Sequence, residues 1–245
     1  MGSLIRLAVG QLEVDWQREH FIHNYSKLFL PSDRTDVPYL AGDEDYEYYE
    51  ADAPVSEPAY SRRLESVVGR LELLGYNLTY CREQYDSHVF IDLYDSDNGV
   101  IPFDKFAKLL ASIDVNNLRM PHPNLGWDLG EFTRKNIFKD PQFTRRYHKL
   151  AKLSRDDAAM FENIDPLVIL RLLAENKKNL SENVVWRIQE HIDADWIHVD
   201  DIYEALGVGD RYLIVTEGKS DSAILKKSLD LLHPDIADFF TFIDM

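Results

Sequence analysis

Two carboxylates near the end of the chain have a spacing that suits a divalent cation. Glu217 follows the apolar run 212–216 (YLIVT), and Asp221 lies four residues further on, where a helical pattern begins. In open α/β sheets, active sites form where a strand ends and the next helix starts, and Mg²⁺ or Mn²⁺ binds carboxylate oxygens. We expect Gly218 to let the backbone turn and to give a metal or phosphate close access. On spacing alone, a helix cap at Asp221 beside an exposed loop acid is an equal alternative.

The elements around this motif form a β-α-β pattern. The apolar runs 212–216 and 239–243 (FFTFI) are typical of buried strands, and 222–232 between them has helical spacing that ends before Pro234. We predict two parallel strands joined by this helix. The side chains expected to pack the helix against the strands are Ile224, Leu225, Leu229 and Leu232.

A basic and aromatic stretch at 131–153 is a second chemical signal. It carries seven bases and two acids, with four aromatic residues between them. Bases combined with aromatic rings bind phosphates and stack on nucleobases, but an amphipathic helix with a basic outer face gives the same pattern. The candidate contacts to nucleic acid or to a protein partner are Arg134, Lys135, Lys139, Arg145, Arg146 and Lys149.

Negative charge is concentrated in one segment of the chain. The 245 residues carry 43 acidic and 27 basic side chains, a formal net charge of −16. Residues 33–58 contain nine acids and one base, which is half of that excess. The segment is typical of a solvated acidic loop, and a docking strip for a basic partner or a mimic of nucleic-acid charge is the functional alternative. This net charge excludes indiscriminate nucleic-acid binding, so any such contact must be local.

Three further motifs do not predict a site. Arg18 and His23 have the Arg-x4-His spacing of HEPN ribonucleases, but that spacing is a frequent accident and the flanking sequence lacks a four-helix pattern. Residues 94–105 resemble an EF-hand loop, yet Lys105 occupies the position that needs a bidentate glutamate. Cys81 has no orienting partner at a recognisable spacing, and we interpret it as a buried structural thiol.

The composition is that of a folded protein outside the secretory pathway. Hydrophobic residues make up 45% and charged residues 29% of the chain, as in globular domains. A single cysteine excludes a disulfide scaffold, and no stretch reaches the ~18 apolar residues of a membrane helix. Arg6, Glu13 and Asp15 interrupt the apolar start, which is therefore no secretory signal. We predict a cytoplasmic protein.

Periodicity predicts mixed structure in the first 155 residues. Residues 4–14 alternate weakly, which is typical of a strand. Helical spacing occurs at 61–74, where Gly75 ends the helix, and again at 102–113. Between these two helices, 77–94 contains two β-like runs.

The following residues have mainly helical spacing. Asp165 caps a helix that opens with Pro166, a second helix starts at Ser181, and a short third one begins near Asp200. We therefore predict an α+β fold in three parts. They are a mixed α/β N-terminal domain at 1–155, a helical segment at 156–209, and the first β-α-β unit of an α/β domain at 210–245.

The stretch 212–221 (YLIVTEGKSD) resembles the first motif of Toprim domains, which occur in topoisomerases, primases and overcoming-lysogenization-defect nucleases. Glu217-Gly218 matches that motif, and Asp221 matches the second acid of the nuclease branch. The resemblance implies that both carboxylates are Mg²⁺ or Mn²⁺ ligands. It also implies that Glu217 is able to act in proton transfer.

The rest of the chain resembles bacterial proteins with a HEPN/Toprim N-terminal domain. The similar segments are MGS…GQLEVDW at the start, RLELLGY at 70–76 and VVWRIQEHIDADWIHVDDI at 184–202. This resemblance implies a component of anti-phage defence. The Toprim pattern also needs a later Asp-x-Asp, whereas the chain ends at Asp244-Met245. We therefore expect the isolated chain to bind Mg²⁺ only weakly, to lack nuclease activity and to leave an unfinished sheet edge.

Two functions compete at this point. In the first, the chain is the N-terminal part of a metal-dependent Toprim-type nuclease of anti-phage defence. In the second, it is a non-catalytic sensor or interaction subunit that docks a partner through the N-terminal domain and the unfinished edge. We expect a protein partner or a homo-oligomer, contact with nucleic acid only through the full-length protein, and no contact with a membrane.

Overall fold

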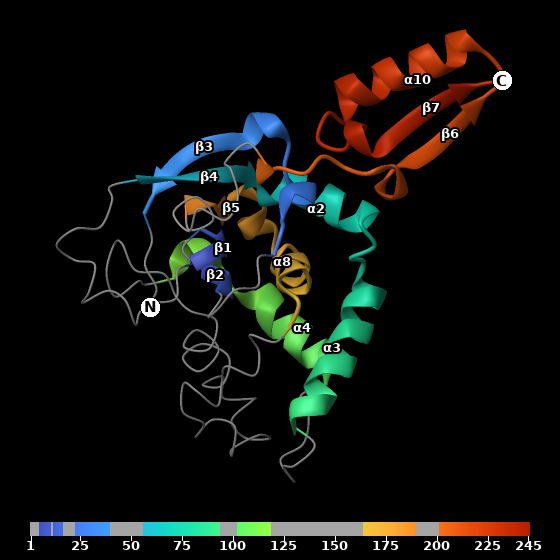
Figure 1. The fold of residues 1–245 in the computed structure, drawn as a ribbon. Coiled ribbons are helices and arrows are strands. Elements are labelled where there is room, and N and C mark those ends of the chain that lie inside the picture. The colour runs from blue at the N-terminus through green and yellow to red at the C-terminus, as the bar shows by residue number, and fades with distance from the viewer. Residues whose placement is uncertain are drawn as a thin grey trace.

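The computed structural model describes residues 5–10, 12–16, 23–39, 56–93, 102–118, 164–189 and 201–245. Across these ranges the fold is α+β, as the sequence predicted. Helices pack against an antiparallel sheet, and a small parallel sheet with its own helix projects from this body (Figure 1). Among these residues no helix has the length and apolar character needed to cross a membrane.

The main sheet joins four strands from the first 63 residues with a fifth at 183–187, in the order β2-β1-β5-β4-β3, and all its neighbouring strands are antiparallel. β1 (Ile5–Val9) and β2 (Leu12–Trp16) form a hairpin next to Gly10, whose φ of +58° lies in the region that favours glycine. The central strand β5 (Asn183–Arg187) lies between β1 and β4, so the sheet is complete only when distant segments meet.

β5 occupies residues that were predicted to be helical. Val184, Val185 and Trp186 are buried and pair with β1 and β4. A short apolar run that is covered on both faces lacks the alternation of a half-exposed strand, so its periodicity does not distinguish it from a buried helix. The helix predicted from Ser181 is therefore wrong. The short helix predicted near Asp200 is also not found, because residues 202–207 are irregular.

A second correction concerns the two β-like runs predicted at 77–94. The helix α3 (Leu78–Leu93) takes their place, and the side chain of Asn77 caps it by accepting the N–H of Tyr80 at 3.0 Å. Cys81 and Tyr85 lie one turn apart on α3 and are fully buried. Burial raises the pKa of the Cys81 thiol to about 11, so the thiol is protonated at neutral pH and is a poor nucleophile.

Three predicted helices are confirmed, namely α2 (Leu64–Leu73), α4 (Phe103–Ser112) and α8 (Pro166–Leu173). Gly75 ends α2 with a φ of +94°, and the N–H of Tyr76 reaches back to Leu71 O at 2.9 Å, as in a Schellman motif. Asp165 caps α8 by accepting the N–H of Leu167 at 2.8 Å.

The sheet and these helices share one hydrophobic core around Trp186. Its indole stacks on Tyr60 at a centroid distance of 5.5 Å and on Phe29 at 6.2 Å. Tyr25 meets the same indole edge-on at 6.1 Å. These aromatic contacts join β4, β5 and the connection before β3 into one packed body.

The acidic segment 33–58 is not a loop throughout. Its two ends form β3 (Arg34–Pro38) and β4 (Ser56–Arg63), which pair with each other. Asp33 Oδ2 lies 2.6 Å from Arg62 Nη1, and Glu57 Oε1 lies 2.9 Å from Arg187 Nε. The loop interpretation is therefore wrong for these ends. Residues 40–55 lie outside the described residues. The same holds for the basic stretch 131–153 and all its candidate contact residues.

The projecting unit consists of β6 (Tyr212–Thr216), α10 (Lys219–Leu232) and β7 (Phe240–Asp244). β6 and β7 are parallel, which confirms the predicted β-α-β arrangement.

The packing predicted for this helix is wrong in part. Ile224, Leu225 and Leu232 are 64%, 46% and 72% exposed, and Leu229 is half-buried. Two strands lie only ~5 Å apart, whereas a helix with its side chains is ~10 Å wide. A two-stranded sheet is therefore too narrow to cover the apolar side chains of α10.

Candidate functional site

The carboxyl ends of β6 and β7 bring acidic residues to one end of the projecting unit. Glu217 directly follows β6, and Asp221 lies in the first turn of α10, where its N–H donates to Gly218 O at 3.1 Å. Asp244 ends β7 and is paired in register with Thr216, the residue before Glu217. The Glu217, Asp221 and Asp244 side chains are all exposed. Asp244 was not predicted as a ligand, and only the parallel register reveals its position.

Hydrogen bonds hold the backbone beside these acids. The hydroxyl of Thr216 lies 2.5 Å from that of Ser222 in α10, and it donates to Gly218 O at 3.2 Å. The N–H of Met245 donates to Thr216 O at 3.1 Å. The strand end is therefore tied to the first turn of the helix and to the neighbouring strand, while the carboxylates remain in solvent.

Gly218 was expected to let the backbone turn and to give a metal or phosphate close access, and the structure does not support the first of these roles. Its φ of −158° and ψ of 158° are extended values that other residues also adopt, so the turn does not depend on glycine. A Cβ at this position would meet no atom within 4 Å. The space beside Gly218 at the end of the strand is therefore open, and the expected access for a metal or phosphate requires such open space.

The donors suit a hard divalent cation, but the described part of the chain does not complete a site. Carboxylates near the N-terminus of a helix are appropriate oxygen ligands. Within the described residues, no three His, Cys, Asp or Glu side chains converge as a metal-binding group. Mg²⁺ requires about six ligands in near-octahedral geometry. Glu217 and Asp221 therefore form at most part of a coordination sphere, and their role as ligands stays a prediction.

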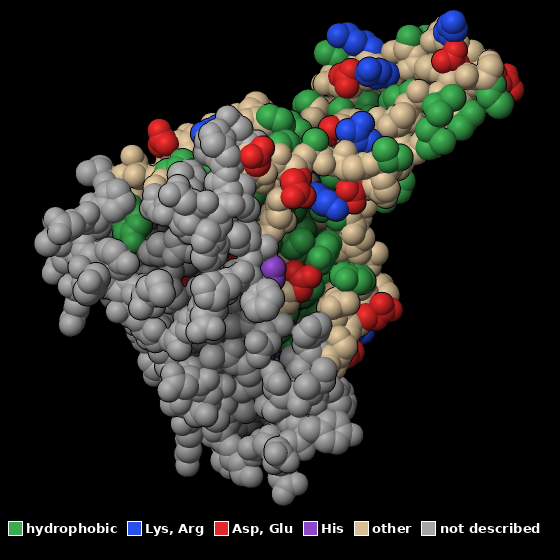
Figure 2. Space-filling model, viewed as in Figure 1, with side chains coloured by type: hydrophobic (Ala, Val, Ile, Leu, Met, Phe, Trp, Pro, Cys, Tyr) green, Lys and Arg blue, Asp and Glu red, His purple; other side chains and the backbone are tan. Residues whose placement is uncertain are grey.

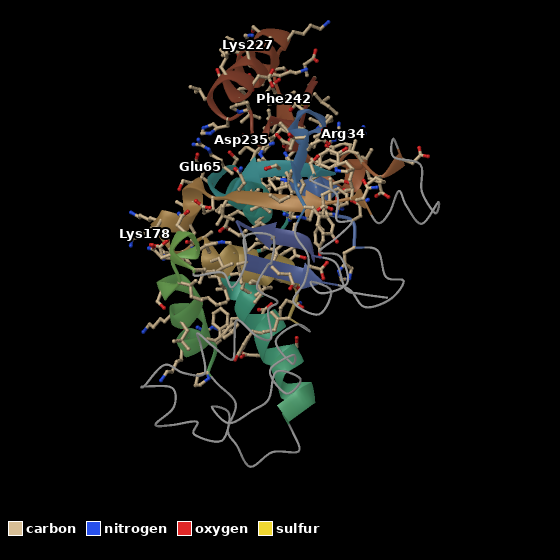
Figure 3. All side chains as sticks on the ribbon, turned by 90° about the vertical axis from the view of Figure 1, so that its left-hand side faces the viewer. Arg34, Glu65, Lys178, Lys227, Asp235 and Phe242 are labelled. Carbon is tan, nitrogen blue, oxygen red and sulfur yellow. The ribbon has the colours of Figure 1, made fainter. Side chains whose placement is uncertain are left out.

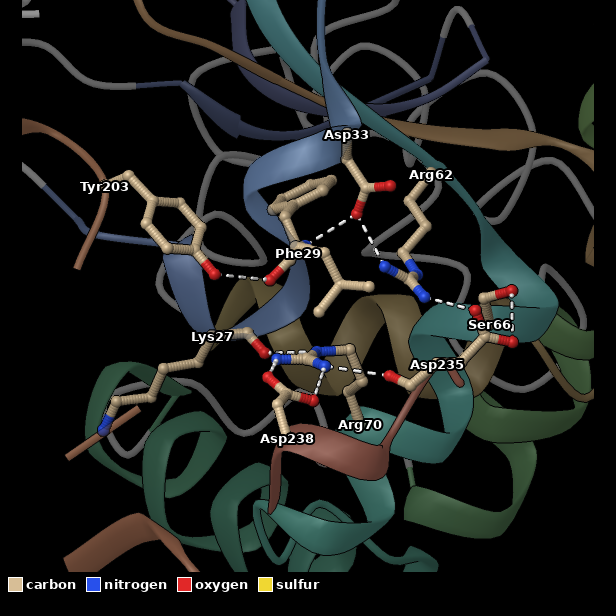
Figure 4. A network of polar contacts seen from close by, with 10 residues as sticks. Lys27, Phe29, Asp33, Arg62, Ser66, Arg70, Tyr203, Asp235 and Asp238 are labelled. Carbon is tan, nitrogen blue, oxygen red and sulfur yellow. Dashed lines mark hydrogen bonds and ion pairs between the residues drawn. The ribbon is translucent and has the colours of Figure 1, made fainter. Parts of the chain in front are cut away.

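A buried arginine connects the opposite end of this unit to the main body (Figure 4). Arg70 of α2 is 0% exposed and donates to both carboxylate oxygens of Asp238, at 2.7 and 2.9 Å. It also donates to the backbone carbonyls of Asp235 and Lys27, at 2.8 and 2.7 Å. The ring of Phe239 lies 4.7 Å from the guanidinium carbon. Such a bidentate, charge-assisted contact has strict geometry and is a specific dock.

Further contacts surround Arg70. Arg62 of β4 bridges Asp33 and Asp235, and the hydroxyl of Ser66 donates to Asp235 at 3.1 Å. The hydroxyl of Tyr212 donates to Leu73 O at 2.7 Å. The projecting unit thus contacts the main body through the turn before β7 and through the first residue of β6. Both of these lie at the amino ends of the strands. The acids lie at the other end of the strands, away from the body (Figure 1).

This dock was missed in the sequence because Arg70 and Asp238 are far apart in the chain. One signal was available. Arg70 lies three residues after Val67, on the same apolar face of the helix as Leu64 and Leu71. A charged residue at helical spacing within an apolar face requires a buried partner.

The Arg-x4-His pair is only half described. His23 Nδ1 lies 3.5 Å from Asp15 and 3.3 Å from the hydroxyl of Tyr25, which donates to Asp15 at 2.6 Å. Burial and the neighbouring Asp15 carboxylate raise the pKa of Tyr25 far above its usual value, so this hydroxyl stays protonated. Arg18 lies outside the described residues.

Comparison with known proteins identifies one family. A family model described as HEPN/Toprim N-terminal domain 1 matches residues 1–208. The match covers the antiparallel sheet with its helices and ends before β6. No curated protein and no solved structure matches the chain.

Proposed function

Because the chain belongs to the HEPN/Toprim N-terminal domain family, we propose that it is the N-terminal part of a metal-dependent nuclease of the Toprim type. One observation carries this proposal: Glu217 follows the first of two parallel strands, and Asp221 lies in the first turn of the helix between them. Ligands of open α/β sheets bind at this end of the strands. From the resemblance of the chain we assign the activity to bacterial anti-phage defence.

In this proposal Glu217 and Asp221 bind Mg²⁺ or Mn²⁺, and Glu217 also transfers a proton. The ion, when bound, would stabilise the negative charge that develops on a phosphodiester. The open space at Gly218 would let a phosphate approach the backbone. Cleavage would require a further Asp-x-Asp segment, so we expect the 245-residue chain alone to be inactive.

A Mn²⁺ titration of the purified chain, followed by electron paramagnetic resonance, tests the metal site. We expect weak binding that Glu217→Gln or Asp221→Asn lowers at least ~10-fold, equivalent to ~1.4 kcal/mol. Asp230→Asn removes an exposed carboxylate from the same helix and serves as the control. Equal Mn²⁺ affinity in all three variants and the original chain would contradict the metal assignment.

A second function has its own observation. Leu213, Val215 and Ile243 are 58%, 50% and 46% exposed, and the alternation along β6 and β7 puts them on one face of the sheet. Figure 2 shows exposed hydrophobic side chains on the projecting unit. A contiguous exposed apolar patch marks an interaction site. The chain would then act as a non-catalytic subunit that docks a protein partner or a second copy.

Sedimentation analysis tests this face as an interface between copies of the chain. If the patch mediates self-association, Val215→Lys dissociates the assembly, because a buried unpaired ammonium is costly. Lys227 lies on the exposed surface of α10, and Lys227→Glu provides a control that changes charge without touching the patch. An unchanged assembly in Val215→Lys would exclude this face as its interface.

A further inference from the structure

The projecting unit relies on the main body to bury its best-enclosed side chain. Within residues 212–245, all of which the structure describes, only Phe239 is buried, at 0% exposure. The guanidinium carbon of Arg70 in the body lies 4.7 Å from the centre of its ring. Figure 3 shows Asp235 at the boundary, below the unit that carries Phe242. The unit therefore has almost no core of its own and depends on the surface that α2 offers.

The body recognises the turn before β7 by shape as well as by charge. A Cβ at Gly69 of α2 would lie 3.2 Å from Ile236 Cγ2, so the missing side chain of Gly69 makes room for the turn. Arg70 donates to both carboxylate oxygens of Asp238 at 2.7 and 2.9 Å. Asp235 accepts from an arginine of β4 and from a serine of α2. Three residues of one turn thus each meet a matching group, which makes the contact specific for this turn.

The unit is joined to the body by one tight turn at 207–211. Val208–Asp210 form a single 3₁₀ turn, in which the N–H of Asp210 donates to Gly207 O at 3.2 Å. An exposed ion pair between Lys27 and Asp210 at 2.7 Å connects this turn to the body. Exposed ion pairs contribute little to stability. Extending the turn would therefore break weak contacts only, whereas separating the unit from α2 would break the whole dock.

A second copy of the chain offers the same surface on α2. We propose that two chains exchange their projecting units, so that the turn 235–239 of one chain docks on α2 of the other while the turn at 207–211 is extended. The closed chain and the exchanged pair then have the same dock contacts, as in other domain-swapped dimers. The exchange rests on the dock alone and does not depend on the roles of Glu217 and Asp221.

The short connection decides which form is populated. It gives the unit of the same chain an effective concentration on the order of millimolar at its own dock. We therefore expect the unchanged chain to stay closed at micromolar concentration. Exchange becomes the favoured form when docking within one chain is blocked.

Charge reversals on opposite sides of the dock test the exchange. Arg70→Glu and Asp238→Arg each place like charges at the fork, so neither chain docks its own unit. In a mixture of the two chains, exchange pairs the unchanged Arg70 of one with the unchanged Asp238 of the other, and the two introduced charges with each other. We expect sedimentation velocity to show a 1:1 dimer in the mixture and not in the separate samples. Arg82→Glu mixed with Asp104→Arg reverses an exposed pair outside the dock and should not associate.

A deletion variant tests the exchange with the dock intact. Removing Val208 and Gly209 leaves three residues in the connection, fewer than the four of a tight turn. We expect this variant to form a dimer in which the N–H groups of Ile236 and Phe239 stay protected from hydrogen exchange. Adding Asp238→Arg should dissociate that dimer.

Two results would overturn the exchange. One is a charge-reversal mixture that sediments like its separate chains together with a deletion variant that stays monomeric. The other is a dimer of the deletion variant that persists after Asp238→Arg, because another surface would then hold it. Val215→Lys changes the exposed apolar face and should leave the exchanged dimer intact, which distinguishes it from association through that face.

Discussion

Replacing Asp238 with asparagine tests how strongly Arg70 holds the projecting unit. The change preserves the shape of the side chain but removes the negative charge of the carboxylate. The two oxygens of this carboxylate accept hydrogen bonds from Arg70 at 2.7 and 2.9 Å. The Arg70 side chain is 0% exposed, so water does not replace the lost partner. We therefore expect Asp238→Asn to destabilise the docked unit.

The magnitude follows from the environment of the two charges. Leaving a buried charge without its partner costs ~3–5 kcal/mol. Asp238 is 33% exposed, and Arg70 keeps its bonds to two backbone carbonyls and its contact with Phe239. Solvent screening and these remaining contacts lower the cost, and we expect a loss of ~2–3 kcal/mol in the free energy of docking.

Hydrogen exchange measures this loss locally. Undocking should accelerate exchange at the N–H groups of Ile236 and Phe239, which lie in the docked turn. Val185 in the central strand should keep its protection, because the main sheet forms without this contact. Asp230→Asn, an exposed acid of α10, is the matched control. A change below about 0.5 kcal/mol, the range of ordinary surface substitutions, would refute the reasoning.

Three further predictions concern single residues. Gly75→Ala should lower the free energy of unfolding by ~1 kcal/mol in a urea titration, because its φ of +94° is unfavourable for alanine; an unchanged midpoint would contradict this. Burial raises the pKa of Cys81 from 9.0 to about 11, so the folded state holds the thiol proton more tightly. Stability should therefore decrease as pH rises from about 9 to about 11, and Cys81→Ser should remove that dependence from pH-resolved melting curves. Arg145→Glu combined with Arg146→Glu should lower the melting temperature or dissociate the assembly. The affinity for nucleic acid should be negligible both before and after this reversal. Anisotropy titrations that show tight oligonucleotide binding, abolished by this reversal at unchanged melting temperature, would favour direct nucleic-acid contact.

Local signals predicted the elements that depend on neighbouring residues. The Asp165-Pro166 start of α8 and the Gly75 end of α2 are set by one side chain or one backbone angle. The motif around Glu217 is likewise contiguous, and its strand, turn and helix were all predicted.

Elements that depend on tertiary packing were mispredicted. β5 is buried between two strands from the start of the chain. A strand in this position has a continuous apolar sequence, because both of its faces are covered. In α3, aromatic and β-branched residues favour a strand, whereas the Asn77 cap and the burial of Cys81 and Tyr85 stabilise a helix. The contact between Arg70 and Asp238 joins residues from distant segments, and no spacing rule reveals which of them meet.

The dock at the amino ends of β6 and β7 makes the projecting unit a lever. Arg70 holds the pivot, and the acids lie at the far end of a strand of five residues. At ~3.3 Å per residue the arm is ~16 Å long, so a rigid tilt of ~5° at the pivot moves that end by ~1.4 Å. Metal–ligand distances tolerate only about 0.2 Å. A rotation too small to break the Arg70 contact would therefore leave the distances among Glu217, Asp221 and Asp244 unchanged, but would move these acids by more than that tolerance relative to any ligand held outside the unit.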